Sequence, residues 1–238
     1  MDWFSYIVAG ILVYVAVVVF IGGSIFQIVK WRRSCKTSIK QGIFPKPRGT
    51  MRFLKLGWDS LVFPWVIDTD AWMWFFVIGM HIAGIGLFFG HLRLFGDPGF
   101  LLSTVGEGTL NNLGGSVGAA IGIFLFVAFM YFLIRRMKYP YKELSVPADY
   151  LLLLLVLLLI LLGDHLRLTH AFEIDSYRTY MASLVAFRPE YPTAIEFSPD
   201  RWVLTFHVFT ANLLLLYFPF SKLVHSLGGW ATNLMRSE

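Results

Sequence analysis

Two histidines stand ten residues apart in an apolar stretch of the chain, WMWFFVIGMHIAGIGLFFGHL (residues 72–92). This stretch is long enough to cross a bilayer core of about 30 Å as a helix, which takes about 20 apolar residues. A histidine inside such a helix is costly, so it usually has a partner and a function. Four other apolar stretches have a similar length, at about 6–29, 115–134, 148–166 and 202–222. The sequence therefore predicts an all-α membrane bundle of five transmembrane helices.

The composition agrees with a membrane protein. Hydrophobic residues make up 57% of the 238 residues and charged residues 15%, against roughly 45–50% and about 25% in soluble domains. The five stretches take up about half of the chain, so we expect a single transmembrane domain over residues 1–238. The first stretch is longer than a signal-peptide core and no charged segment precedes it, so we expect a retained helix.

Charged residues are divided unevenly between the loops. Nine Lys or Arg and no acid lie from Lys30 to Lys55, and Arg135, Arg136, Lys138 and Lys142 follow the third stretch, whereas the loops of the opposite side mix five arginines with eight acids. By the positive-inside rule the N-terminus lies outside and the C-terminus, with the tail 226–238, in the cytoplasm. We therefore expect a multi-pass protein of the cell membrane. Its basic loops would face anionic membrane lipid rather than nucleic acid, and they are also candidates for docking a soluble partner.

The fifth stretch contributes a second pair of histidines, His207 and His225, eighteen residues apart. If the second and fifth stretches are antiparallel, His91 lies level with His207 near the outer face and His81 with His225 nearer the cytoplasm. Ten helical residues rise about 15 Å and eighteen about 27 Å, and the mean suits two stacked haems. Imidazoles can ligate b-type haems from both sides of the macrocycle. The ten-residue spacing leaves the two rings of the second stretch roughly 80° apart around the helix, which tilted helices must absorb.

Small residues accompany these histidines. Glycines occur in the second stretch and at the start of the third, among them Gly79, Gly84, Gly86, Gly90, Gly114, Gly118 and Gly122. They are consistent with a large flat cofactor, and small-xxx-small helix packing explains them equally well. Cys35 is the single cysteine, which excludes an internal disulfide, covalent haem attachment and an iron–sulfur ligand set. A partner would have to carry the next redox centre.

Two motifs resemble a known family, the gamma subunits of respiratory nitrate reductases. HIAGIGLFFGH (81–91) resembles the family's second helix, and YFPFSKLVH (217–225) resembles the Phe-Pro-Phe-Ser-basic-Leu-x-His run of its final helix. The pair Arg135-Arg136 matches as well, and the resemblance covers most of the chain. The sequence YFPFSK and the long segment 164–201 look more like those of the cytochrome b subunits of heterodisulfide reductase and of dissimilatory sulfite-reduction complexes. The lysine associated with quinol binding in nitrate reductases has no obvious match, and Asn111 or Asn112 falls near its position.

The resemblance implies an electron-transfer subunit of a quinol-oxidising respiratory complex. It implies an outer haem b held by His91 and His207, and an inner haem b held by His81 and His225. A quinol, expected to be menaquinol, would be oxidised near the outer haem with release of two protons outside. Electrons would pass inward to a cytoplasmic iron–sulfur subunit of the heterodisulfide-reductase type, with further membrane or iron–sulfur subunits. A nitrate reductase gamma subunit is the alternative within the family.

Polar groups at the outer ends of the second and fourth stretches form the candidate quinol site: Arg93, Asp164, Arg167 and His170. An arginine can hydrogen-bond a quinone carbonyl, and a carboxylate or histidine can take the proton. Snorkelling or a haem-propionate salt bridge explains each arginine singly as well. His165 and His170 fit either a wet interfacial segment or proton release and the wall of a quinol pocket.

Other interpretations remain for the basic residues and for the function. Arg135 and Arg136 are candidates either for the docking face of the partner or for binding a haem propionate. A proton-coupled transporter would favour several ionisable groups within the spans, and few occur besides the histidines. A passive anchor for a soluble enzyme has no need for four membrane histidines.

Overall fold

The computed structural model describes residues 1–40, 54, 57–59, 62–225 and 228. Five helices in this part of the chain are long and apolar enough to cross a membrane, within Trp3–Trp31, Ala71–Phe95, Glu107–Met137, Pro147–Leu168 and Arg201–Phe220. The prediction of an all-helical fold is confirmed for the described residues, and that of a multi-pass membrane protein is confirmed as well. The predicted basic segment and tail fall partly outside the described residues, at 41–53, 55–56, 226–227 and 229–238.

The described helices belong to two compact units, Met1–Val15 with Gly79–Leu214 and Ala16–Ile78 with Leu215–Glu238. The first unit contains α1 (Trp3–Tyr6), η1 (Ile7–Ile11), most of α5 (Ala71–Leu92), η2 (Arg93–Phe95), α6 (Gly99–Val105), α7 (Glu107–Met137), η3 (Tyr141–Leu144), α8 (Pro147–Leu168), α9 (Ile174–Val185), α10 (Thr193–Glu196) and most of α11 (Arg201–Tyr217). The second unit contains most of α2 (Leu12–Lys40), α4 (Pro64–Thr69), the start of α5, η4 (Phe218–Phe220) and η5 (Lys222–Val224).

Local sequence sets the start of several helices. The carboxylate of Asp2 caps α1 by accepting the backbone N–H of Ser5 at 2.9 Å. Helix α8 begins with Pro147, whose missing N–H is not needed in a first turn. Two residues later, Asp149 accepts the backbone N–H of Val146 at 3.3 Å. In both helices a carboxylate thus satisfies a backbone N–H at the start of the helix, before the apolar part begins.

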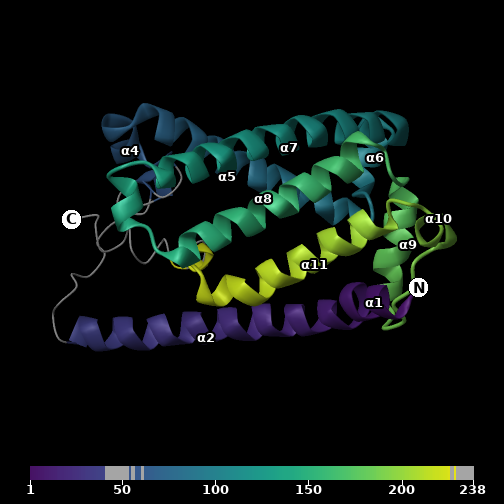
Figure 1. The fold of residues 1–238 in the computed structure, drawn as a ribbon, viewed down its shortest axis with the longest axis horizontal. Coiled ribbons are helices and arrows are strands. Elements are labelled where there is room, and N and C mark those ends of the chain that lie inside the picture. The colour runs from purple at the N-terminus through teal and green to yellow at the C-terminus, as the bar shows by residue number, and fades with distance from the viewer. Residues whose placement is uncertain (41–53, 55–56, 60–61, 226–227, 229–238) are drawn as a thin grey trace. The chain divides into compact units, whose positions relative to one another are not determined.

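In the first unit, α7 and α8 lie side by side (Figure 1). Ala83 of α5, Leu125 of α7 and Ile160 of α8 form a core that joins the three helices. Glycines on one face of α5 make the approach possible, because a Cβ added at Gly86 would lie 3.3 Å from Cδ1 of Ile121. Close helix packing therefore accounts for that glycine.

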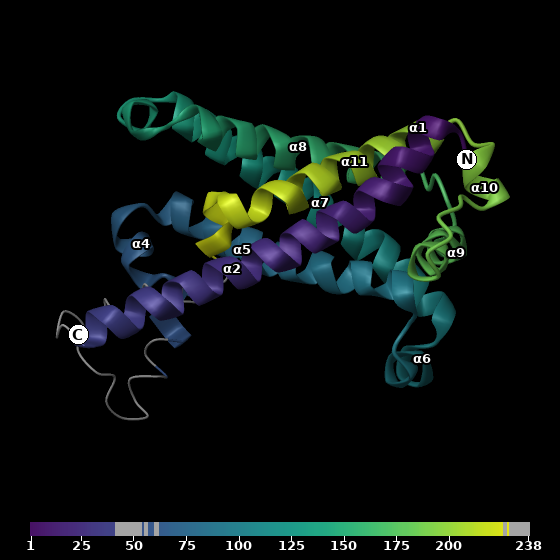
Figure 2. The same ribbon diagram turned by 90° about the horizontal axis from the view of Figure 1, so that it is seen from below.

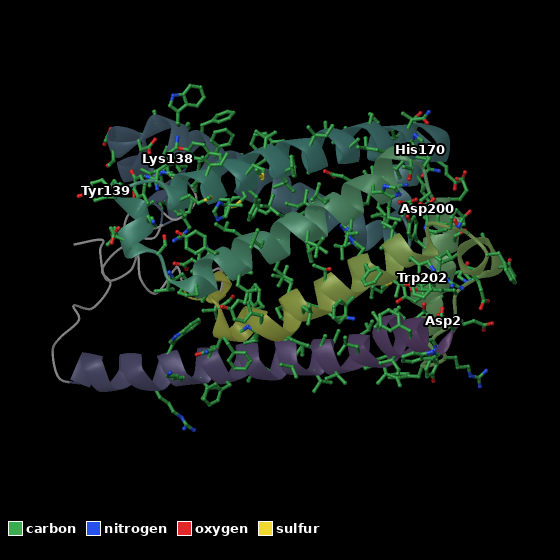
Figure 3. All side chains as sticks on the ribbon, in the orientation of Figure 1. Asp2, Lys138, Tyr139, His170, Asp200 and Trp202 are labelled. Carbon is green, nitrogen blue, oxygen red and sulfur yellow. The ribbon has the colours of Figure 1, made fainter. Side chains whose placement is uncertain are left out.

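Helix α9 runs crosswise to α8 and α11 (Figure 1, Figure 2). The segment between α8 and α11, which contains α9 and α10, covers one end of the first unit, and we call it the cap. Its core consists of Ala9, Leu166, Tyr180, Leu184, Tyr191, Ile195 and Leu204. We call this end of the first unit the capped end and the opposite one the Lys138 end. Figure 3 shows Asp2, His170, Asp200 and Trp202 at the capped end, and Lys138 and Tyr139 at the other.

The first spanning helix is irregular where it enters the cap, because η1 is a π-helix. The carbonyl of Val8 accepts the side-chain amide of Asn212 at 3.0 Å, and the carbonyl of Ala9 accepts the hydroxyl of Tyr180. Carbonyls released from the regular helical pattern need such partners inside a membrane protein. The buried donors therefore explain why the helix keeps this turn, which the sequence did not predict.

In the second unit, α2 packs against the chain that follows α11. The rings of Phe20 and Phe218 have their centroids 5.0 Å apart, and the side-chain amide of Gln27 donates to the carbonyl of Pro219 at 2.9 Å. A Cβ added at Gly23 would lie 2.7 Å from Cβ of Pro219. The proline is therefore seated on a glycine of α2, within the same unit that holds η5.

Candidate functional site

The first unit brings His91 of α5 close to His207 of α11, so that the two rings interact electrostatically. Nδ1 of His91 lies 2.8 Å from the carbonyl oxygen of Leu87. Because a carbonyl only accepts, Nδ1 carries the proton and the neutral ring has its lone pair on Nε2. Backbone acceptors of this kind orient metal-binding histidines and select their tautomer. His91 is therefore prepared for ligation through Nε2.

The ring of His207 is seated against α8. A Cβ added at Gly163 would lie 3.0 Å from Cε1 of His207, so a larger residue there would have to displace the ring by a few tenths of an ångström. Nδ1 of His207 is buried and makes no hydrogen bond in the part of the chain that the structure describes. A buried polar atom without a partner is unusual in a folded protein. The ring is thus positioned by α8, through Gly163 and the backbone of Leu159, while Nδ1 remains unsatisfied.

These two histidines fit the axial pair of a haem. Ligation from both sides of the macrocycle needs two neutral imidazoles and flat space beside the helices. Cβ atoms added at Gly84 and Gly90 of α5 would meet no atom within 4 Å. Gly84 precedes His91 by seven residues, which is two helical turns, so it lies on the same side of the helix. The glycines that do not serve helix packing therefore border open space next to a ligand.

The other two predicted ligands lie in different units. His81 is half-buried on α5 in the first unit, and His225 is exposed after η5 in the second. Nδ1 of His225 lies 2.7 Å from the carbonyl of Lys222, which selects the same tautomer as in His91. The pairing of His81 with His225 stays a prediction from the sequence.

Three charged side chains of the first unit lie against glycines of α7. The pairs are Arg93 on Gly114, Arg167 on Gly118 and Asp164 on Gly122. A Cβ at Gly118 would lie 3.4 Å from Nε of Arg167, and one at Gly122 would lie 2.8 Å from Cγ of Asp164. Each step of four residues along α7 is about 6 Å. Three of the four predicted quinol-site residues thus gather along one face of this helix.

Arg93 belongs to an ion cluster just beyond the end of α5. Its guanidinium binds the carboxylate of Asp97, donates to Oδ1 of Asn111 at 2.7 Å and to the carbonyl of Leu110 at 3.2 Å. Arg178 of α9 pairs with the same carboxylate. The side chain of Asp97 is only 3% exposed, and hydrogen bonds from Arg93 hold its pKa below the usual value.

Sequence reasoning missed Asp97 and Arg178. The four-residue spacing between Arg93 and Asp97 is a signal for an ion pair when both follow a helix. Nothing in the sequence pattern connects Arg178 with them, because α9 reaches the cluster only through the fold of the cap.

The two histidines near the end of α8, His165 and His170, differ in their surroundings. Nε2 of His165 lies 3.0 Å from Oδ1 of Asp200, whereas His170 is exposed beyond α8 with a φ of +49° (Figure 3). Burial raises the pKa of Tyr177 on α9 to about 12, and the charges of Arg167 and Asp200 also act on it. Tyr177 is therefore a neutral phenol close to one predicted site residue, and no sequence motif identified it.

Arg135 and Arg136 brace the turn between α7 and α8. Nη1 of Arg136 donates to Oδ2 of Asp149 at 3.0 Å, and its carbonyl accepts the hydroxyl of Tyr150 at 2.9 Å. The guanidinium of Arg135 lies 3.5 Å from the centroid of the Tyr141 ring, in a cation–π contact. These contacts give the turn a fixed shape, while binding to a propionate or a partner stays a prediction.

Comparison with known proteins confirms the predicted resemblance to the family. Two relatives are each described as an Hdr-like menaquinol oxidoreductase cytochrome b-like subunit. The protein from Archaeoglobus profundus is 24% identical over 92% of this chain and 75% of its own, and that from Archaeoglobus fulgidus is 26% identical over 93% and 77%. Residues 71–237 match the nitrate reductase gamma subunit family. Since this match covers well over half of the sequence, the chain belongs to the nitrate reductase gamma subunit family.

Proposed function

We propose that the chain is the dihaem cytochrome b subunit of a menaquinol-oxidising membrane complex. His91 and His207 would hold one haem b, and His81 and His225 the other. The observation that carries this proposal is the approach of His91 to His207, with Nε2 of His91 left for ligation by the contact of Nδ1 with Leu87. The two relatives, described as menaquinol oxidoreductase cytochrome b-like subunits, support the choice of haem and menaquinol.

Haems bound at these positions would supply one-electron carriers. The residues of the chain supply orientation, since the carbonyl of Leu87 sets the tautomer of His91 and the open backbone of Gly163 sets the place of His207. The apolar helices exclude water from the site and so lower the local dielectric constant.

The quinol site is proposed at the capped end. Asp164 and Arg167 would line it, with Arg93 and His170 at its margin. Quinol oxidation releases protons, so the site needs polar groups beside the redox centre and a way to water. The capped end offers both, because His170 is exposed and His165 with Asp200 forms a polar pair at the end of α8. A guanidinium can bind a quinone oxygen, and a carboxylate can accept a proton.

The Lys138 end is proposed to face the cytoplasm and a soluble iron–sulfur partner. Positive charge on the loops of this end supports the orientation. The turn between α7 and α8 exposes Lys138 and Lys142 and leaves Tyr139 83% exposed, while Arg136 and Asp149 hold the turn rigid. An exposed aromatic side chain on a rigid turn is suited to docking, because little freedom is lost on binding. The name of the relatives favours an Hdr-like complex over a nitrate reductase.

A pyridine-haemochrome spectrum of the purified protein tests the proposal. Two haems b per chain are expected, and a protein without haem would refute the proposal. His91→Ala and His207→Ala should lose the same haem, and His81→Ala and His225→Ala the other. If the His91 and His225 variants lost the same haem, the pairing would be wrong. His165→Ala should keep both haems.

The partner is tested by cross-linking and by identifying the subunits that co-purify. An Hdr-like iron–sulfur subunit should cross-link to the Lys138 end, through Lys138 or Lys142. Cross-links confined to residues 92–114 or 164–201 would contradict the docking surface. Co-purification of a nitrate reductase catalytic subunit would favour the alternative within the family.

A further inference from the structure

We infer that Asp164 is the group that accepts a proton from the quinol. We also infer that Gly122 of α7, which has no side chain, leaves the space, or notch, in which the carboxylate of Asp164 lies. The inference rests on the proposed function and assigns separate roles to residues that the sequence only grouped together.

The first step is the state of the Asp164 side chain. It lies within the spanning helix α8, and its carboxylate rests on the backbone of Gly122, where an added Cβ would overlap Oδ1. Among the described residues, the carboxylate of Asp164 has no partner in a hydrogen bond or an ion pair. An unpaired carboxylate inside a membrane helix is costly, and such residues mark proton or substrate paths. Helix packing does not account for it, because a small apolar residue would fill the same notch.

Asp164 lies directly after the residue of α8 that contacts His207, a proposed haem ligand. Gly163, the preceding residue, contacts the ring of His207, with 3.0 Å between the position of an added Cβ and Cε1. Consecutive helical residues point about 100° apart. Helix α8 therefore touches α11 with Gly163 and α7 with Asp164 at the same level. A quinol bound at this level would therefore lie beside the carboxylate of Asp164 and close to His207, the proposed haem ligand.

The third step separates Asp164 from its charged neighbours. Arg93 lies against Gly114, which precedes Gly122 by eight residues on α7. Its guanidinium already binds Asp97 and Asn111, so it is committed to the ion cluster. Arg167, one turn beyond Asp164, lies on Gly118, and its guanidinium forms no hydrogen bond or ion pair within the described part of the chain. Arg167 is thus the cation available to bind the second oxygen of the quinol, and Arg93 supports the helix ends.

The chemistry balances with the proposed haem as oxidant. Oxidation of a hydroquinone to a quinone breaks two O–H bonds and releases two protons and two electrons. One proton passes from a hydroxyl to the carboxylate of Asp164, which becomes a carboxylic acid, and the other passes to water at the capped end. The two electrons would be taken up one at a time by the haem that His91 and His207 would hold. Loss of the proton from Asp164 to water restores the carboxylate for the next turnover.

The experiment compares four variants of the complete protein: Asp164→Asn, Asp164→Glu, Gly122→Ala and Gly115→Ala. Gly122→Ala keeps the carboxylate but displaces it, whereas an added Cβ at Gly115 of the same helix meets no atom within 4 Å. The measurements are haem content, the dithionite-reduced spectrum and the rate of haem reduction by a menaquinol analogue over a range of concentrations. Asp164→Asn should lower the maximal rate about 100-fold or more, with the KM, haem content and dithionite-reduced spectrum unchanged.

The other variants sharpen the comparison. Asp164→Glu should recover part of the rate, Gly122→Ala should be slowed, and Gly115→Ala should match the wild type. If the Asp164 and Gly122 variants keep their haem and react at the wild-type rate, the role of Asp164 is refuted while the proposed function stands. Loss of haem from Asp164→Asn would also refute this role, because it would indicate a structural one. A wild-type protein without haem b would refute the proposed function itself.

Discussion

Replacing Asp97 with asparagine should destabilise the capped end strongly. The side chain of Asp97 is 3% exposed, and those of its partners Arg93 and Arg178 are 14% and 23% exposed. Asparagine keeps the size but cannot neutralise two guanidinium groups held around it. Removing one partner from a buried ion pair costs about 3–5 kcal/mol, because the remaining charge, here that of Arg93, stays largely buried without compensation. We expect a loss of that size in the free energy of unfolding.

The matched control is Asp175→Asn. Asp175 also pairs with Arg178, at 3.2 Å, but its side chain is 80% exposed, and an exposed pair contributes about 0–1 kcal/mol. Thermal unfolding in detergent, followed by circular dichroism, measures both variants. For a chain of this size, 1 kcal/mol shifts Tm by about 2–4 °C. Asp97→Asn should therefore lower Tm by about 6–20 °C and Asp175→Asn by at most about 4 °C. Equal shifts in the two variants would refute the argument from burial.

The same cluster predicts how the difference depends on pH. Hydrogen bonds from Arg93 lower the pKa of Asp97 in the folded state, relative to about 3.9 in the unfolded chain. A lowered pKa adds stability above the unfolded value, and this contribution is lost as the pH falls through the folded value. The gap in Tm between the wild type and Asp97→Asn should be constant near neutrality and should narrow below about pH 4. A gap that widens in acid would show that the sign is wrong.

Two further predictions concern the proposed haem and the partner. Gly163→Ala places a Cβ 3.0 Å from Cε1 of His207, and overpacking of about 1–3 kcal/mol corresponds to haem binding that is roughly 5- to 150-fold weaker. Haem content after gel filtration should fall in this variant and not in Gly115→Ala, and equal retention would contradict the packing argument. Tyr139→Ala should reduce co-purification of the proposed cytoplasmic partner with no change in haem content. Phe197→Ala, an equally exposed aromatic residue at 83% but at the capped end, is the control, and a similar loss in both would point to nonspecific exposure.

The five spans could be predicted because the thickness of a bilayer sets the length of an apolar stretch. The prediction was least accurate at polar helix ends. We expected the third span to begin near residue 115, whereas α7 begins at Glu107, because the polar segment before the apolar run is also helical. The cap was not predicted as structure at all. Its helices are short, and residues such as Tyr180 and Tyr191 are buried through contacts with η1 and α11 that no local period reveals.

The histidines were visible in the sequence because a costly residue stands out in an apolar run. Their environment was not visible. The tautomer of His91 depends on a carbonyl one turn earlier in its own helix, and the sequence is compatible with that contact at any helical histidine. The seat of His207 depends on Gly163 from another helix. Spacing thus identifies candidate ligands, whereas readiness for ligation follows from packing.

The glycines of α7 show most clearly where sequence reasoning ends. A glycine every four residues permits close helix packing, contact with a flat cofactor or a seat for a long side chain, and the three uses share one pattern. In this chain Gly118 and Gly122 seat Arg167 and Asp164, which are three residues apart on α8. Glycines at a spacing of four on one helix, with ionisable residues at a spacing of three on the next, are therefore complementary patterns. Neither pattern is decisive alone, because the direction from which the neighbouring helix approaches determines which side chain meets each notch.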